Sequence, residues 1–203
     1  MASQSPKENK HSFASIVMVL VIFGSLAVLV FVPVGTFESV RTSEQASITS
    51  WLGQDADQWI MLRIFKFLQA VNQEATQALD SASFTGNNKI DGWFSQRIYA
   101  ALVWGHVVLY RSGVLLMWGV FAIPVVLATV MDGYWRREIS KTNFSSQSPV
   151  LHKSGMDATK TTLALMFAWV FIPWHISMVV APIGFFSIGA AVWLWISNAP
   201  KRI

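Results

Sequence analysis

The sequence contains no cysteine, which excludes disulfide bonds, thiolate nucleophiles and zinc–thiolate sites. Charge is also scarce, because Asp, Glu, Lys and Arg make up 13% of the 203 residues, whereas about a quarter is usual in globular domains. Three stretches, 12–33, 112–131 and 161–196, contain none of these four residue types. About 20 apolar residues in a helix cross the hydrocarbon core of a bilayer, where backbone amides have no water to bond. We therefore predict an all-α integral membrane protein.

The first apolar run has the position of a signal peptide but not its proportions. Lys7, Lys10 and His11 precede it, as the charged region of a signal peptide would. The run is longer than a typical signal core, however, and no small-x-small cleavage site follows it. We expect an uncleaved first transmembrane helix at 12–33.

The distribution of charge predicts the topology, since cytoplasmic loops are enriched in Lys and Arg. The polar segment 1–11 is expected to be a disordered cytoplasmic N-terminus. Segment 34–111 is slightly acidic and is assigned to the outer side. Segment 132–160 carries five basic residues against three acidic ones, which predicts a basic cytoplasmic loop. The short tail 197–203 is basic too and is assigned to the cytoplasm.

Both basic segments lie on one side only if the last apolar block, 161–196, crosses the membrane twice. Its 36 residues suffice for two short helices, and Pro173 and Pro182 bracket the expected turn. The prediction is therefore four transmembrane helices, formed by 12–33, 112–131 and a hairpin at 161–196, with both termini cytoplasmic. The alternative has three spans, with the last block tilted or re-entrant.

The outer segment contains one clear amphipathic helix. Within 55–80, apolar residues recur at three- and four-residue spacing, and polar ones occupy the other side. This helix either lies on the membrane surface or packs on a neighbouring outer helix. Residues 84–92 are rich in turn formers and predict a loop, after which a helical pattern runs from Phe94 into the second span, 112–131.

Three further local features follow from single residues. Arg111 is expected at the membrane interface, because an arginine at mid-bilayer costs about 2.5–3.5 kcal/mol. Pro124 is expected to kink the second span. Ser154 and Asp157 have the spacing of a capping box, which predicts that the next helix begins near Gly155.

No catalytic, cofactor or metal site is predicted. The sequence has no HExxH or GxSxG motif and no glycine-rich phosphate loop. The spans carry no Asp, Glu, Lys or Arg, which argues against a proton-coupled carrier. His106 and His175 could approach each other near the outer face, but hydrogen bonding at the interface is the simpler interpretation.

The basic segment that follows the second span has two interpretations. Asp132 and Arg136 are four residues apart and can pair on a helix, while Arg137 and Lys141 share a face. The charge either sets topology and attracts anionic lipid, or forms a docking surface for a cytoplasmic protein. Five dispersed cations make a weak footprint for nucleic acid, so direct nucleic-acid binding is not expected.

A resemblance favours the second interpretation. The block Met131-Asp132-Gly133, Arg136-Arg137, Phe144, Ser145, Ser148 and Val150-Leu151-His152-Lys153 resembles a motif of integrating-conjugative-element inner-membrane proteins. That family has an N-terminal span, a long outer segment, a central span followed by a basic loop, and a C-terminal helical hairpin. Many members carry a second histidine where this chain has Lys153, which weakens any metal role for the loop.

The resemblance implies a part in conjugative DNA transfer. The membrane would be a bacterial inner membrane, segment 34–111 periplasmic, and the partner the coupling ATPase of a type IV secretion system. The expected protein-interaction residues are Asp132, Arg136, Arg137, Lys141, Ser148 and His152. The predicted function is a non-enzymatic accessory component of that apparatus, in contact with membrane lipids and open to self-association. The alternatives are a small membrane transporter, a lipid-interacting subunit of another membrane complex, or an enzyme that uses His106 or His175.

Overall fold

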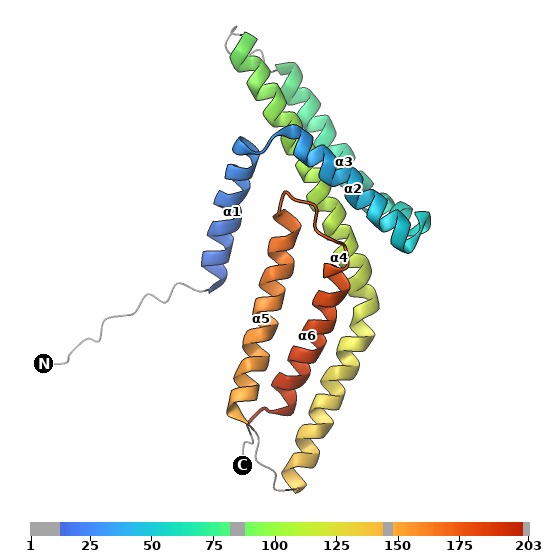
Figure 1. Cartoon of the computed structure of the whole chain (residues 1–203), viewed down its shortest axis with the longest axis vertical. Coiled ribbons are helices and arrows are strands. Elements are labelled where there is room, and N and C mark those ends of the chain that lie inside the picture. Colours follow the sequence, from blue (N-terminus) through green and yellow to red (C-terminus); the bar gives the residue numbers. More distant parts are fainter. Residues whose placement is uncertain (1–12, 82–87, 144–147, 201–203) are drawn as a thin grey trace, which may run out of the picture.

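The computed structural model describes residues 13–81, 88–143 and 148–200, and within these ranges every regular element is an α-helix. This confirms the predicted all-α class. The helices are α1 (Phe13–Phe31), α2 (Val34–Leu52), α3 (Gln54–Ser81), α4 (Asn88–Thr142), α5 (Pro149–Phe171) and α6 (Val180–Ser197). Figure 1 shows how these helices are arranged in space.

Helix α4 is the axis on which the other helices pack. Its 55 residues extend over about 82 Å at 1.5 Å per residue. The predicted helix from Phe94 into the second apolar run is confirmed, and it continues past Pro124 to Thr142. Helices α5 and α6 form a hairpin along one half of α4, while α2 and α3 cross the other half (Figure 1).

The predicted amphipathic helix at 55–80 corresponds closely to α3. Ile60 and Ile64 are buried, and a Cβ built on Gly113 would lie 2.8 Å from Ile60 Cγ2, so α3 packs closely on α4. Phe67 and Val71 belong to the same predicted apolar face but are exposed. The protein-packing alternative therefore holds for the first half of α3.

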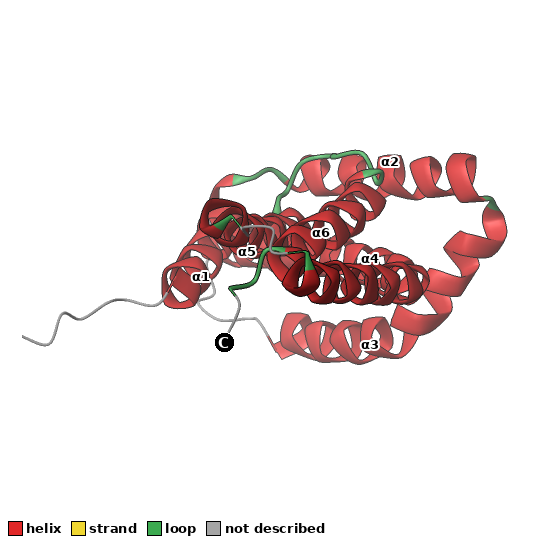
Figure 2. Ribbon diagram, turned by 90° about the horizontal axis from the view of Figure 1, so that it is seen from below, coloured by secondary structure: helices red, strands yellow, loops and turns green. Residues whose placement is uncertain are grey.

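Helix α2 was not anticipated from the sequence. It begins after Pro33 and ends at Gly53, whose φ of +86° favours glycine. The axis of α2 makes an angle of 107° with that of α1. Figure 2 shows that α2 and α3 pass on opposite sides of α4 and meet beyond it. Helices α2 and α3 thus form a clamp around α4.

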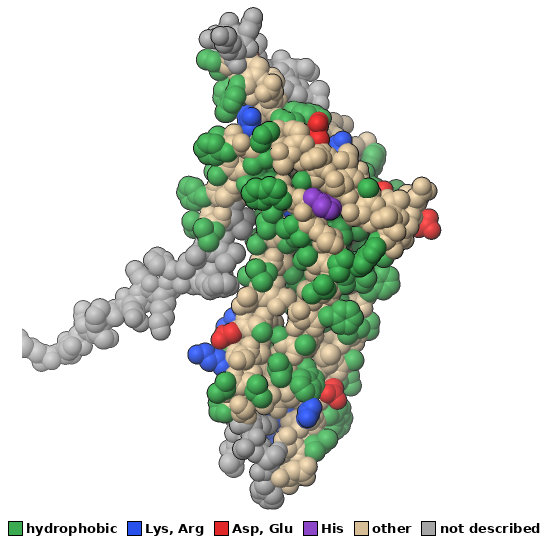
Figure 3. Space-filling model, viewed as in Figure 1, with side chains coloured by type: hydrophobic (Ala, Val, Ile, Leu, Met, Phe, Trp, Pro, Cys, Tyr) green, Lys and Arg blue, Asp and Glu red, His purple; other side chains and the backbone are tan. Residues whose placement is uncertain are grey.

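Two helices are long and apolar enough to cross a membrane, namely Ile90–Thr142 and Val180–Ser197. A third appears if the bent pair Phe23–Phe31 and Val34–Leu52 counts as one span. Helix α5 is not among these candidates, and its first half carries Lys153, Asp157 and Lys160. The described residues thus provide two to three candidate spans, not clearly four. Figure 3 shows hydrophobic side chains over much of the visible surface, as expected of helices in contact with lipid.

Several predicted boundaries differ from the structure. Most of 132–160 is helical, because α4 extends to Thr142 and α5 begins at Pro149. The capping box at Ser154 and Asp157 is wrong: Ser148 is the N-cap, its hydroxyl accepts a hydrogen bond from the Leu151 amide, and proline follows at the first helical position. Residues 88–92, expected in a loop, belong to α4. Residues 1–12, 82–87, 144–147 and 201–203 lie outside the described residues, and so does the predicted disordered N-terminus.

Candidate functional site

The most buried charges of the described chain are Arg111 on α4 and Glu44 on α2. Their side chains are 0% and 1% exposed, and they form a hydrogen-bonded ion pair. The sequence predicted Arg111 at the membrane interface, and its depth in a membrane stays a prediction. The structure encloses Arg111 between α2, α4 and the end of α5, so protein surrounds its charge.

Arg111 uses every N–H donor of its guanidinium group. The Nε–H donates to the Glu44 carboxylate at 3.0 Å, and one Nη2–H donates to the same carboxylate. The other Nη2–H donates to the Trp174 carbonyl at 2.7 Å, and Nη1 donates to the carbonyls of Trp169 and Ile172. The last carbonyls of a helix have no partner within it, so Arg111 caps the C-terminal end of α5.

These hydrogen bonds decide whether the protein can bury the charges of Arg111 and Glu44. Removing two charges from water costs several kcal/mol for each ion, and only a well-formed pair with further hydrogen bonds offsets that cost. The indole ring of Trp169 adds a cation–π contact, with its centroid 5.3 Å from the guanidinium carbon of Arg111. We call Arg111, Glu44 and the three carbonyls the Arg111 junction. It joins the clamp of α2 and α3 to the α5–α6 hairpin.

A sequence signal for Glu44 existed but was missed. The buried stripe of α2 consists of Phe37, Val40, Glu44 and Ile48, spaced by three, four and four residues. A carboxylate in line with such an apolar stripe indicates a buried charge partner, because burying it alone is too costly. Ser and Thr are frequent along α2 and obscured this periodicity.

A second arginine of α4 does for α1 what Arg111 does for α5. Arg97 Nη1 lies 3.1 Å from the carbonyl oxygens of Leu29, Val30 and Val32 at the C-terminal end of α1. Arg97 and Arg111 are 14 residues apart, close to four helical turns, and so occupy nearly the same face of α4. Both apolar helices are therefore attached by their C-terminal ends to one face of α4.

Of the candidate histidine pair, His106 takes part in the packing of the helices. The His106 ring stacks on Tyr110 with their planes 10° apart, and the Tyr110 hydroxyl donates to Asp57 Oδ1 at 2.7 Å. This contact ties α3 to α4. His175 is exposed in the turn after α5. In the part of the chain that the structure describes, no group of three or more His, Asp or Glu residues is placed to hold a metal ion.

The predicted interaction residues gather where α4 and α6 end and α5 begins. Asp132 accepts a hydrogen bond from Trp193 Nε1 at 2.6 Å, and the Arg136 guanidinium carbon lies 4.9 Å from the Trp193 ring centroid. Asp132 and Arg136 were expected to pair with each other; the structure directs both to α6. Arg137 donates to the Pro200 carbonyl at 3.3 Å.

The remaining predicted residues make contacts within the chain as well. His152 Nδ1 lies 3.0 Å from the Trp195 carbonyl oxygen, Lys141 pairs with Glu138, and Ser148 caps α5. We call this part of the molecule, where α4 ends and α5 begins, the basic end. Several of its residues stabilise the packing of α4, α5 and α6. Their role toward a partner stays a prediction.

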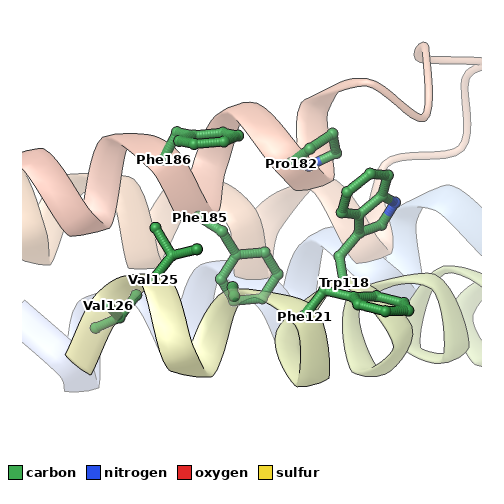
Figure 4. Close-up of a pocket in the computed structure, with 8 residues that line it drawn as sticks. Trp118, Phe121, Val125, Val126, Pro182, Phe185 and Phe186 are labelled. Atoms are coloured by element: carbon green, nitrogen blue, oxygen red, sulfur yellow. The ribbon is translucent and has the colours of Figure 1, made fainter. Parts of the chain in front are cut away.

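An apolar pocket lies between α4 and α6. It is small, about 70 Å³, and aromatic and aliphatic side chains line it (Figure 4). Its lining includes Trp118, Phe121, Val125, Val126, Pro182, Phe185 and Phe186. The indole N–H of Trp118 is the one polar side-chain group among these residues, so they offer no group for acid–base or nucleophilic chemistry.

Comparison with known proteins adds one finding. A family model described as IncC plasmid conjugative DNA transfer protein DtrJ-like matches residues 29–198. No curated protein and no solved structure matches the chain. The matched range extends from the end of α1 to the residue after α6, so it contains Arg97, the Arg111 junction and the basic end.

Proposed function

Because the chain belongs to the DtrJ-like family of IncC plasmid conjugative DNA transfer proteins, we propose that it is a non-enzymatic membrane component of a type IV secretion apparatus. The predicted link to conjugative DNA transfer is confirmed by this membership. The family description names a plasmid, so attribution to an integrating element stays a prediction. Two helices long and apolar enough to cross a membrane are compatible with a membrane location.

The proposed location is the bacterial inner membrane, with both termini and the basic end in the cytoplasm. Helix α4 crosses once, so its two ends face different compartments. The clamp of α2, α3 and the first part of α4 is then periplasmic. The α5–α6 hairpin returns the chain to the cytoplasm, which makes four spans if α1 and α5 both cross. Charge supports this orientation, since the end of α4, the start of α5 and the tail are all basic.

Reporter insertions on either side of α4 test this orientation. A periplasm-dependent reporter is expected to be active when inserted after residue 87 and inactive when inserted after residue 146, because only one crossing separates these positions. A cytoplasm-dependent reporter at the same positions should give the inverse result. Equal activity at both positions would contradict the orientation. A fusion after residue 203 then separates four spans from three, because an odd number places it in the periplasm.

We further propose that the basic end docks the coupling ATPase. Asp132, Arg136, Arg137, Ser148 and His152 shape this end through their internal contacts. Lys141, at 40% side-chain exposure, and Lys153 remain accessible beside them. The single observation that carries the proposal is the presence of these exposed cations at the end of α4 and the start of α5 of a conjugative transfer protein. An acidic patch on the partner would complement it and accelerate encounter.

Charge reversal of the exposed lysines tests the docking proposal. The Lys141→Glu/Lys153→Glu variant is expected to recover about tenfold less coupling ATPase in a mild-detergent pull-down, which corresponds to about 1.4 kcal/mol. The matched control is Arg63→Glu/Lys66→Glu, which reverses two exposed charges on α3 at the other end of the molecule. Equal recovery by both variants would count against docking through the basic end. Transfer frequency in mating assays should follow the pull-down result.

A further inference from the structure

An apolar slot of about 380 Å³ separates α1 from α5. Both helices contribute small side chains to its walls, so the slot is open where two membrane helices would normally touch. A Cβ built on Gly24 meets no atom within 4 Å, even though Gly24 lines the slot. The lining includes Leu20, Gly24 and Val28 of α1 and Ala164, Ala168 and Phe171 of α5.

Two hydrogen-bond donors of α4 without partners lie close to the end of this slot where α1 and α5 terminate, although neither residue is part of its lining. Arg97 Nε and Trp104 Nε1 are buried and have no hydrogen-bond partner among the described residues. Arg97 already binds the carbonyls of Leu29 and Val32, next to Val28 in the slot wall. The Trp104 ring lies 6.2 Å from that of Phe171, which also lines the slot.

These donors follow a pattern on α4. Arg97, Trp104 and Arg111 are spaced by seven residues and so form one stripe that faces α1 and α5. Arg111 has all its donors satisfied by protein, whereas Arg97 Nε and Trp104 Nε1 are buried without a partner among the described residues. A buried donor left unsatisfied costs about 1–3 kcal/mol, so a missing acceptor is expected at this position.

The walls of the slot suit a hydrocarbon chain. A hydrocarbon chain is narrow and flexible, and the slot walls are apolar helices that face lipid.

We propose that the slot binds one anionic phospholipid, with an acyl chain between α1 and α5 and phosphate or ester oxygens at Arg97 and Trp104. The positive charge of Arg97 complements a phosphate, and such charge-assisted hydrogen bonds are stronger than neutral ones. The bound lipid would fill the gap between α1 and the rest of the fold. It would thereby hold α1 against α5 along its length, in addition to the Arg97 contact at its end.

Native mass spectrometry of the full chain, released from micelles doped with phosphatidylglycerol, tests this. The wild type is expected to retain one phosphatidylglycerol after loosely attached lipid has been removed. Ala168→Leu fills the slot and should lower the retained fraction about tenfold. Ala158→Leu, an exposed position on the same helix outside the slot, is the matched control and should retain the lipid.

A second pair of variants tests the polar contact while keeping an aromatic ring at the position. Trp104→Phe removes the free N–H but keeps an aromatic ring beside Phe171, and should weaken retention several-fold. Trp135→Phe, at an exposed position on α4, should have no effect. Phosphatidylcholine with the same acyl chains should be retained less, and glycerol phosphate without chains should not be retained.

Three results would overturn the proposal. Retention unchanged in both Ala168→Leu and Trp104→Phe would place the lipid elsewhere. Binding of glycerol phosphate equal to that of the phospholipid would indicate a site for free phosphate. If the wild type retained a bound polypeptide or a second copy of the chain and Ala168→Leu lost it, protein and not lipid would occupy the slot.

Discussion

Arg111→Leu is expected to lower the free energy of unfolding by about 3–5 kcal/mol, since removing one partner leaves a buried charge uncompensated. Glu44, 1% exposed, would keep its carboxylate without a partner. The carbonyls of Trp169, Ile172 and Trp174 would lose their donor at the same time. Because the Arg111 junction connects α2, α4 and the end of α5, the loss should loosen the clamp from the hairpin.

Unfolding of the purified protein in mixed micelles, followed by circular dichroism, measures this effect. Arg63→Leu is the control, because Arg63 is an exposed arginine on α3. The double variant Glu44→Leu/Arg111→Leu removes both charges and should be less destabilised than the sum of the single variants. If Arg111→Leu were no less stable than Arg63→Leu, the Arg111 junction would not be a major source of stability.

Gly155→Ala is expected to destabilise the α5–α6 hairpin by about 1–3 kcal/mol, as overpacked contacts do. A Cβ at this position would lie 2.5 Å from the Trp195 backbone nitrogen and 2.8 Å from the Ala191 carbonyl oxygen. Backbone atoms of a helix cannot move aside singly, so α5 and α6 would have to separate. Alanine normally improves a helix relative to glycine by about 1 kcal/mol, which makes a loss of stability diagnostic.

Two glycines of α6, Gly184 and Gly189, complete a graded series. At Gly184 the nearest atoms belong to the flexible Met166 side chain, which can adjust, so Gly184→Ala should be close to neutral. At Gly189 the nearest atom is 3.7 Å away, on Thr129, so Gly189→Ala should leave stability unchanged or raise it. The unfolding midpoint is expected to be highest for Gly189→Ala, lower for Gly184→Ala and lowest for Gly155→Ala. Equal midpoints would show that α5 and α6 are not in close contact.

Prediction from sequence succeeded where a regular pattern was strong. The three- and four-residue spacing of apolar residues located α3 within one residue at each end, and the continuous pattern after Phe94 indicated the long helix α4. It failed for α2, whose many Ser and Thr residues can bond their own backbone and weaken the apolar periodicity. It also placed the start of α5 at Gly155, since Ser154 and Asp157 matched the spacing of a capping box, whereas the helix begins with Ser148 as N-cap and Pro149 at its first position.

The site was harder to predict than the helices. The residues expected to bind a partner were chosen from charge and motif, and several of them also make contacts with α6 or with the tail. Arg97 was not singled out and Arg111 was expected only at the membrane interface, because an arginine in a sequence says nothing of which carbonyls it will reach. Those carbonyls belong to Leu29–Val32 and Trp169–Trp174, which are remote in sequence.

Composition alone determined that this chain is helical and rich in apolar runs, since a backbone in lipid must bond within its own segment. The tertiary structure decided which charges are buried and what they hold. Burial of Arg111 depends on Glu44 and on three carbonyls that only folding brings within reach. The same holds for the slot between α1 and α5, because an open space between two helices is a property of their packing and not of either sequence.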